Sequence, residues 1–313
     1  TRRLRASSFS FRMNRVMNDI TLLDGGVGQE LFHRGERPRA TNLWSVQVMI
    51  DQPDLVEAVH LAYFAAGSTI ATSNTYAIYR DRLDGTQYEA QFAELNQTAM
   101  TLANAAATRV KGARVAGSIG PIRASYRPDL HPDYDTALQI YGEKARMTAP
   151  MCDFLLCESV ASILHARSVL DAALQTGLPV WLALTVDDQD GTRLRSGELL
   201  ADILPYAAKA SALLINCSSP EAIKPALDIF KNFGLPYGAY ANGFEKIAEE
   251  FLVDKSTVDA LSARKDLTPA MYADHVMSWI DQGATIVGGC CEVGPAHIEE
   301  IARRLRAAGH TIV

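Results

Sequence analysis

The sequence predicts an α/β fold, a single-domain (β/α)8 TIM barrel, and three observations lead to that prediction. Short apolar runs alternate with amphipathic helical patterns from residue 20 to the end of the chain. Eight apolar runs can be separated, most with short connections to the helical patterns between them. The length of 313 residues suits one such barrel. An open, doubly wound sheet is disfavoured, because no glycine-rich phosphate-binding sequence follows the first strand.

Four strand–helix pairs account for the first half of the chain. The first apolar run stops at Asp24-Gly25-Gly26, and a helix follows Pro53. Gly120-Pro121 ends the third run, and Gly177 stops the helix after the fourth. The expected strands are 20–23, 68–73, 114–119 and 154–157, and the expected helices begin after 53 and span 91–110, 134–149 and 163–176.

The second half repeats the same alternation. Thr268-Pro269 opens one helix and Pro295 opens the last, as proline commonly does at a helix start. Long unpatterned stretches follow several strands, on the face where barrels keep their active sites. The expected strands are 179–185, 212–216, 237–241 and 284–287, the helices 199–209, 220–233, 268–282 and 295–308, and the long loops 76–88, 125–131, 186–197 and 242–267.

Composition narrows the class of partner. The formal net charge is −6, which argues against general nucleic-acid binding, because there are no surplus cations to replace counterions along a phosphate backbone. No apolar run approaches the roughly 20 residues that span a bilayer. Five cysteines in so long a chain do not make a disulfide framework and suggest reduced thiols. We therefore expect a cytoplasmic protein that acts on small molecules, with its oligomeric state open.

Residues 1–18 stand apart as a basic extension. They contain three serines and no acidic residue. We interpret them as an over-long start, with Met13 or Met17 as the natural beginning, and expect no order there. The alternative is an organelle transit peptide, which is rich in arginine and serine and poor in acids. The arginines are Arg2, Arg3, Arg5, Arg12 and Arg15.

The most informative motif is Gly288-Gly289-Cys290-Cys291, directly after the eighth expected strand. A third cysteine, Cys217, follows the sixth. A barrel brings the carboxyl ends of these strands over one mouth, where three thiolates make a soft metal site with an open fourth position. Thiolate-rich zinc suits the activation of a second thiol better than the splitting of water. The sequence therefore predicts a catalytic Zn²⁺ site.

Other interpretations of the cysteines remain open. The three could be small buried hydrophobic residues, and Cys290 and Cys291 could form a vicinal disulfide. Cys157 lies within an apolar strand and Cys152 just before it, so we expect both to serve in packing.

Polar residues at other strand ends are candidates for binding a substrate. In one interpretation, the backbone N–H groups of Asp24, Gly25 and Gly26 face the carboxylate of a ligand. In the other, these residues form an ordinary strand-to-helix turn. Glu158 closes the fourth strand, where it would bind an ammonium group or form an ion pair with an arginine.

Further candidates are aromatic or amide side chains. We expect Trp44, and Asn74 with Tyr76 after the second strand, to line the pocket. Asn216 immediately precedes Cys217 and would orient the metal site through hydrogen bonds to its ligands.

These motifs resemble the homocysteine S-methyltransferase family over nearly the whole chain. The resemblance implies a barrel that binds one zinc ion through Cys217, Cys290 and Cys291, with the sulfur of L-homocysteine in the fourth position. Family members use S-methylmethionine, S-adenosylmethionine or betaine as methyl donor, and one branch uses a methylated corrinoid. The matching segments are Leu22-Leu23-Asp24-Gly25-Gly26, Leu43-Trp44-Ser45, Gly117-Ser118-Ile119-Gly120-Pro121, the strand end at Glu158, Asn216-Cys217 and Gly288-Gly289-Cys290-Cys291.

Two segments depart from the family pattern. Glu292 follows the cysteine pair where relatives usually have a basic residue, and Phe244 lies in a divergent segment after the seventh strand. The chain has no Asp-x-His-x-x-Gly segment for a corrinoid, so a sulfonium donor is the better prediction.

The residues and the resemblance together predict an enzyme, a zinc-dependent methyltransferase that makes methionine from homocysteine. Glu158 would hold the amino group, and the backbone from Asp24 to Gly26 the carboxylate. One alternative is a betaine-dependent enzyme, or one acting on another thiol or a selenol. A barrel metallohydrolase is disfavoured because no His and Asp ligands cluster at the strand ends. The last alternative function is that of a non-catalytic zinc-binding or redox-sensing protein.

Overall fold

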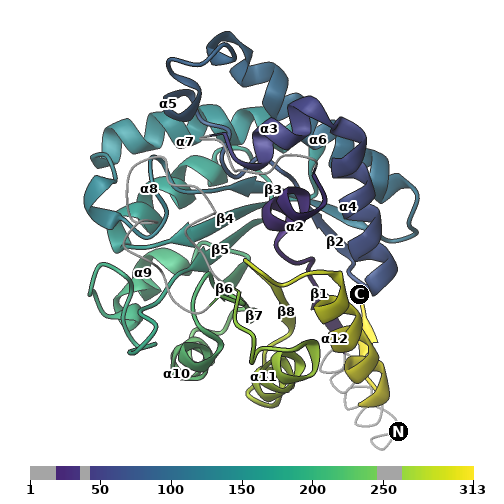
Figure 1. Ribbon diagram of the computed structural model, residues 1–313. Helices are drawn as coiled ribbons and strands as arrows, with labels where there is room; N and C mark the ends of the chain where they lie inside the picture. Colours follow the sequence, from purple (N-terminus) through teal and green to yellow (C-terminus); the bar gives the residue numbers. More distant parts are fainter. Residues whose placement is uncertain (1–18, 36–42, 245–262) are drawn as a thin grey trace, which may run out of the picture.

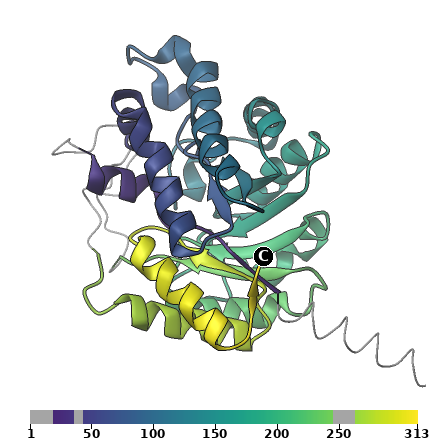
Figure 2. The ribbon, with the colours of Figure 1, turned by 90° about the vertical axis from the view of Figure 1, so that its right-hand side faces the viewer.

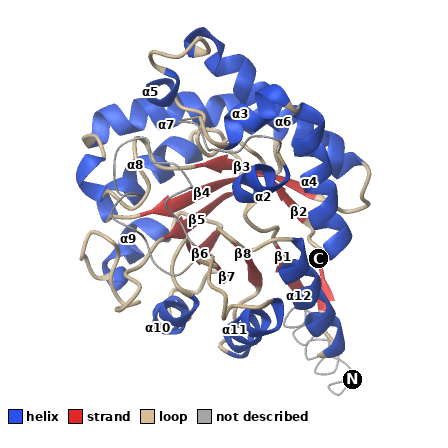
Figure 3. Ribbon diagram, in the orientation of Figure 1, coloured by secondary structure: helices blue, strands red, loops and turns tan. Residues whose placement is uncertain are grey.

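Parallel strands form the inner wall of the fold, and helices surround it (Figure 1; Figure 3). The computed structural model describes residues 19–35, 43–244 and 263–313. The expected basic extension 1–18, and residues 245–262 of the expected loop 242–267, lie outside them. None of the described helices is long and apolar enough to cross a bilayer.

The elements follow one another as strand and helix around the ring. The strands are β1 (Asp19–Leu22), β2 (Ile70–Thr72), β3 (Arg114–Ile119), β4 (Phe154–Val160), β5 (Val180–Leu184), β6 (Ala212–Asn216), β7 (Tyr237–Ala241), β8 (Ile286–Gly289) and β9 (Thr311–Ile312). The helices are α2 (Val27–Arg34), α3 (Ser45–Asp51), α4 (Pro53–Ala66), α5 (Arg80–Leu83), α6 (Phe92–Thr108), α7 (Tyr134–Thr148), α8 (Ile163–Leu174), α9 (Leu204–Ala207), α10 (Pro220–Phe230), α11 (Pro269–Asp281) and α12 (Pro295–Ala307). Short 3-10 helices are η1 (Glu89–Gln91), η2 (Pro128–Leu130), η3 (Ala149–Met151) and η4 (Leu200–Ile203).

Alternation along the strands separates two apolar layers. In β4, Phe154 and Leu156 point into the barrel, where Phe154 stacks on Trp181 with ring centroids 4.0 Å apart. Leu155 and Cys157 point outward into the larger core between sheet and helices. Side chains therefore fill the barrel below the mouth, and the polar site can only lie above them.

The seam between β1 and β2 closes the barrel without a regular strand pairing. The order of hydrogen-bonded strands runs β2-β3-β4-β5-β6-β7-β8-β1-β9. Across the seam, Thr69 N donates to Leu22 O at 2.8 Å. The Asp24 carboxylate then accepts from Thr72 N at 2.7 Å and Thr72 Oγ1 at 2.6 Å. The Asp24 side chain thus accepts the hydrogen bond that a backbone carbonyl of β1 would accept in a regular strand pair, at the rim of the mouth.

The eight expected strands are confirmed, but β4 runs to Val160, so Glu158 lies within it and does not close it, and the expected helix 199–209 is only η4 and α9. Two further differences lie at the C-terminal end. β8 is shifted to include Gly288 and Gly289, which the sequence pattern places after the strand. A Cβ atom on Gly288 would lie 2.6 Å from the Leu23 Cβ, so close packing against β1 requires glycine there. The sequence does not predict β9, which pairs with β1. The preceding helix, α12, packs against α4, and Figure 2 shows the C-terminal end of the chain on this side of the barrel. The last elements thus close the ring against the first.

Candidate metal centre and substrate cavity

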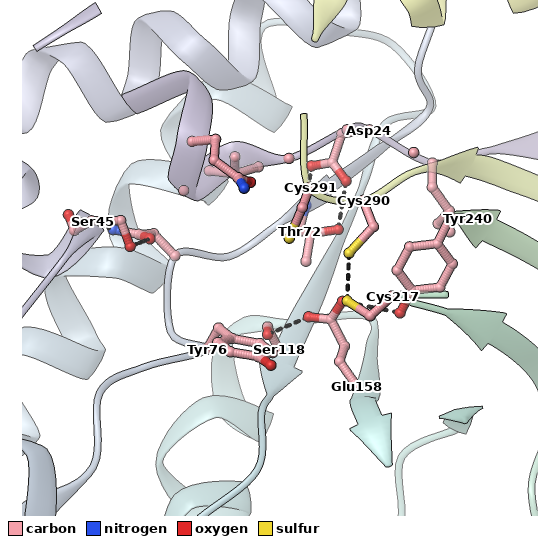
Figure 4. Close-up of a pocket in the computed structure, with 18 of the residues that line it drawn as sticks. Asp24, Ser45, Thr72, Tyr76, Ser118, Glu158, Cys217, Tyr240, Cys290 and Cys291 are labelled. Carbon is pink, nitrogen blue, oxygen red and sulfur yellow. Dashed lines mark hydrogen bonds between the residues drawn. The ribbon is translucent and has the colours of Figure 1, made fainter. Parts of the chain in front are cut away.

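A cavity of about 100 Å³ opens at the carboxyl ends of the strands (Figure 4). Its wall includes every residue proposed above for zinc or substrate binding except Asn216. Glu158 lies within β4 near its carboxyl end, Trp44 directly precedes α3, and the other residues come from the loops that follow β1, β2, β6 and β8. The fold therefore gathers residues far apart in the sequence around one space.

The three predicted cysteines lie together at the cavity wall. Cys217 follows β6, and Cys290 and Cys291 follow β8. The Sγ atoms of Cys217 and Cys290 are 2.7 Å apart, and all three sulfurs lie within 4.8 Å of one another. All five cysteines are free thiols, so the vicinal disulfide is not formed.

The local backbone geometry sets the direction of the three cysteine side chains. Cys217 has φ of 49°, a left-handed conformation that turns the chain sharply at the end of β6. Cys290 N donates to Ala241 O at 2.9 Å, so this residue still continues the β7–β8 pairing. Gly243 N donates to Cys291 O at 2.6 Å and fixes the second cysteine.

The cluster favours one negative charge. Burial alone would raise the pKa of the Cys217 thiol, but hydrogen bonds from the other two thiols and from the Ser159 and Tyr126 hydroxyls hold that pKa well below its usual range. The pKa values of Cys290 and Cys291 are raised, chiefly by their hydrogen bonds to Cys217. The three thiols thus titrate as one coupled group.

The donor set fits a soft divalent metal. Tetrahedral zinc–thiolate bonds of about 2.3 Å hold sulfurs roughly 3.8 Å apart, a spacing that three sulfurs within 4.8 Å can meet. Among the described residues, this is the one group of three or more Cys, His, Asp or Glu side chains placed to bind a metal. No His and Asp cluster of the kind a metallohydrolase needs occurs in that part of the chain.

Glu158 is a buried carboxylate facing the cavity. Ser118 Oγ donates to Oε1 at 2.5 Å, and Tyr240 OH donates to Oε2 at 3.0 Å. Burial raises its pKa to about 8, although the Ser118 and Tyr240 hydrogen bonds lower it. No arginine or lysine of the described segments forms an ion pair with it, so the structural ion pair considered above is not present there.

The Asp24-Gly25-Gly26 turn packs against the cysteine loop. Gly26 N donates to Val293 O at 3.0 Å, and a Cβ atom on Gly25 would lie 1.9 Å from that same oxygen. Glycine is therefore required for the turn to approach the cysteine loop this closely. The Gly26 N–H group is already bonded to Val293 O and is not available to a ligand. This corrects the expectation that the whole turn binds a carboxylate. Asp24, whose pKa burial raises to about 7, holds the seam through Thr72.

Two other side-chain N–H groups lie on the cavity wall. Trp44 Nε1 is buried and makes no hydrogen bond within the described segments, and Gln29 Nε2 is buried with no acceptor there except the Cys291 thiol, whose pKa a hydrogen bond from Gln29 lowers. Gln29 is only 2% exposed and lies in the first turn of α2, a helix without a side-chain N-cap. Buried unpaired donors are costly, so these groups are suited to a ligand acceptor.

The remaining predicted residues differ in what they offer. Tyr76 lies edge-to-face with Trp44, with ring centroids 6.2 Å apart, and bonds Ser125 Oγ at 2.8 Å. Asn74 lines the cavity, but its amide is engaged with Ser45, accepting from Oγ at 2.7 Å and donating to the carbonyl at 3.2 Å. Asn216 Nδ2 lies 3.4 Å from Cys217 Sγ, which agrees with its expected orienting role.

Several residues at the site were not found from the sequence. Ser118 and Tyr240 hold Glu158, Ser159 contacts Cys217, and Tyr126 packs on the cysteines together with Phe244. Ser118 and Tyr240 could have been found, because each lies on an inward-facing position near a strand end. No local pattern marks Tyr126 or Ser159.

Of the two divergent residues, only Phe244 reaches the site. Glu292 points away from the cavity and lies 3.2 Å from His33 Nε2 on α2. Cys157 is buried in the outer core, and Cys152 packs beside Gly117, as expected for packing thiols.

Fold and site together define a (β/α)8 barrel with a three-thiol, metal-competent centre at its mouth. A model of the family described as homocysteine S-methyltransferase matches residues 21–305, and the chain belongs to this family. It is 31% identical to the homocysteine S-methyltransferase of Escherichia coli, covering 91% of this chain and 95% of that protein. It is 26% identical to homocysteine S-methyltransferase YbgG of Bacillus subtilis, covering 92% and 95%.

A solved structure agrees with the fold. The metallated form of the homocysteine methyltransferase MmuM from Escherichia coli superposes with a TM-score of 0.76 at 26% identity, covering 91% of this chain and 96% of that one. The barrel prediction is thereby confirmed.

Proposed function

We propose that this chain transfers a methyl group from a sulfonium donor to the sulfur of L-homocysteine, with Zn²⁺ held by Cys217, Cys290 and Cys291. The observation that carries the proposal is the three-thiol cluster opening onto the same cavity as Glu158, a buried carboxylate with no cation of its own among the described residues. Membership in the homocysteine S-methyltransferase family supports it.

Zinc bound by three thiolates would supply a fourth position that keeps a substrate thiol ionised at neutral pH. The protein's own residues bind and orient the rest of the substrate. Glu158 accepts the ammonium group, while Ser118 and Tyr240 hold its two oxygens in place. An ammonium group beside Glu158 favours the ionised carboxylate, which offsets the cost of burying it.

The carboxylate of the amino acid would lie at the start of α2. This helix end carries partial positive charge and has no side-chain cap. Trp44 Nε1, which lacks an acceptor in the described part of the protein, and Gln29 Nε2 beside it supply the donors. The Trp44 and Tyr76 rings form an aromatic wall on which the cationic donor can lie.

Catalysis would depend mainly on positioning. A sulfonium leaves as a neutral thioether, so no general acid or base is needed at the methyl carbon. Tyr126 and Phe244 pack over the cysteines and exclude water, which leaves the attacking sulfur less solvated. The proposal places the whole site in residues 19–313, with small molecules as substrates.

The test is methionine formation by the zinc-loaded protein. Homocysteine is supplied with S-methylmethionine, S-adenosylmethionine or betaine in separate reactions, and selenocysteine replaces homocysteine in a parallel set. Methionine from a sulfonium donor supports the proposal, and product from betaine alone or from the selenol alone supports the corresponding alternative. No product in any reaction, at full zinc occupancy, would favour a non-catalytic thiol protein.

Cys290→Ser should abolish zinc binding and turnover while leaving the barrel folded, because the site then loses one of three thiolates. Cys152→Ser is the matched control, since that thiol packs beside Gly117 away from the cavity. Unchanged zinc content and activity in Cys290→Ser would contradict the assignment.

A further inference from the structure

β4 carries an extra residue where it reaches the mouth of the barrel. Cys157 is paired with Leu182 and Val160 with Leu184, so three steps along β4 match two along β5. Cys157 and Val160 both face the outer core. In a regular strand, Ser159 would share that outward face with Cys157. The bulge instead lets two consecutive residues, Glu158 and Ser159, turn toward the site.

Ser159 is held in this position by its neighbours. It is 1% exposed, and its φ of 56° is left-handed, a conformation that non-glycine residues seldom adopt. Its backbone N–H donates to Asn216 Oδ1 at 3.0 Å. Its Oγ lies 3.2 Å from Cys217 Sγ and 3.4 Å from Asn216 Nδ2.

The direction of these hydrogen bonds follows from the Asn216 amide. Its oxygen is occupied by the Ser159 N–H, so its Nδ2 group must point at Ser159 Oγ and Cys217 Sγ. Nδ2 can only donate, so the serine oxygen accepts from it. The hydroxyl proton is directed to Cys217 Sγ at 3.2 Å, and the Tyr76 hydroxyl lies beside the same group. The bond O–H···S is strongest when the sulfur is a thiolate.

We infer that Ser159 is a positioning residue of the metal centre, whose hydroxyl donates to Cys217 Sγ and fixes the direction of that ligand. The inference rests on the proposed function, since it assigns a role at the proposed zinc site. Because Ser159 adjoins Glu158, the bulge also sets the distance between the ammonium site and the ligand sulfur.

The test compares Ser159→Ala with Ser159→Gly. Both remove the hydroxyl, but glycine also relieves the left-handed backbone conformation. Zinc affinity is measured by competition with a chromophoric chelator, and the thiolate-to-metal absorption band is recorded after cobalt substitution. Methionine binding at saturating zinc reports whether the bulge still presents Glu158. Ser168→Ala is the matched control, because Ser168 is a buried serine whose hydroxyl donates to the His165 carbonyl at 3.0 Å.

We expect both variants to lose zinc affinity by about tenfold or more, as is typical when a partner of a metal ligand is removed. The cobalt band should shift equally in both, with methionine affinity within about twofold of the unmodified protein. Unchanged zinc affinity in both variants would overturn the inference. A loss in Ser159→Ala that is absent in Ser159→Gly would overturn it too, since backbone strain would then be the cause.

Failure of the proposed function gives a different pattern. Zinc affinity is measured without a methyl donor, so a zinc-binding protein that makes no methionine overturns the proposed function and leaves the role of Ser159 standing. A chain that binds no zinc overturns both.

Discussion

Glu158 shows how a single residue can be prepared for a charged ligand. The residue is 7% exposed, and two hydroxyl donors hold its carboxylate, with no cation among its described neighbours. Burial raises its pKa from 4.5 to about 8, so Glu158 is mostly protonated at neutral pH when no cation lies beside it. Binding of an ammonium group therefore requires the Glu158 carboxyl group to lose its proton.

This predicts a pH-dependent affinity for methionine, a ligand with an ammonium group and no thiol. Below pH 8 the affinity should rise by up to about tenfold per pH unit, as the fraction of ionised Glu158 rises, and it should level off above that pH. Calorimetry of methionine binding from pH 6 to pH 9 measures the effect. Glu158→Gln should bind more weakly, with no such rise.

The control is the comparison of the unmodified protein with Glu158→Gln, because Asp24 and the ligand titrate in both proteins. A rise of equal size in Glu158→Gln would show that another group is responsible and would contradict the proposed role of Glu158.

At the level of residues, the sequence predicts the metal centre better than its surroundings. Adjacent cysteines after two glycines form a local motif that can be seen without a structure. The contact of Ser159 with Cys217 depends on a bulge and on a neighbouring amide 57 positions away. Such contacts cannot be predicted from periodicity, because a bulge breaks the alternation on which the prediction depends.

Among the elements, the seam between β1 and β2 has the most specific chemistry. Asp24 replaces a backbone acceptor there and receives two hydrogen bonds from Thr72. Removing one partner of a buried acceptor usually costs about 1–3 kcal/mol.

Thr72→Val should therefore lower the free energy of unfolding by about 1–3 kcal/mol, because the similarly shaped side chain leaves one oxygen of Asp24 without its donor. Chemical denaturation measures the change. Thr108→Val, at an exposed helical threonine whose hydroxyl donates to Ala105 O, should change stability by less than about 0.5 kcal/mol. Equal stability of both variants would show that the Asp24–Thr72 contact does not hold the seam.

The element boundaries also show where prediction from the sequence stops. β3 and β7 agree with the expected ranges, because their apolar runs are bounded by turn residues. β8 does not, since glycine has low strand propensity and was placed outside the strand, while its close packing against β1 requires it inside. β9 and α5 are two and four residues long, too short to show a period.

For the whole molecule, the barrel is what turns separate motifs into one site. Cys217 and Cys290 are 73 positions apart, yet their sulfurs are 2.7 Å apart in the fold. The rule that parallel strands meet at one mouth was sufficient to predict this convergence. The same rule does not say which side chains on the wall carry N–H donors for a ligand. The sequence predicts Trp44 on the wall, but its unpaired N–H group and the position of Gln29 follow only from the packing of α2 and α3.

X-ray absorption at the zinc edge tests the central claim most directly. The protein is loaded with one zinc ion and measured with and without homocysteine, with methionine as the control ligand. The account predicts three sulfur neighbours at about 2.3 Å in the free protein and four with homocysteine. An unchanged sulfur count on adding homocysteine, or a first shell dominated by nitrogen and oxygen, would contradict it.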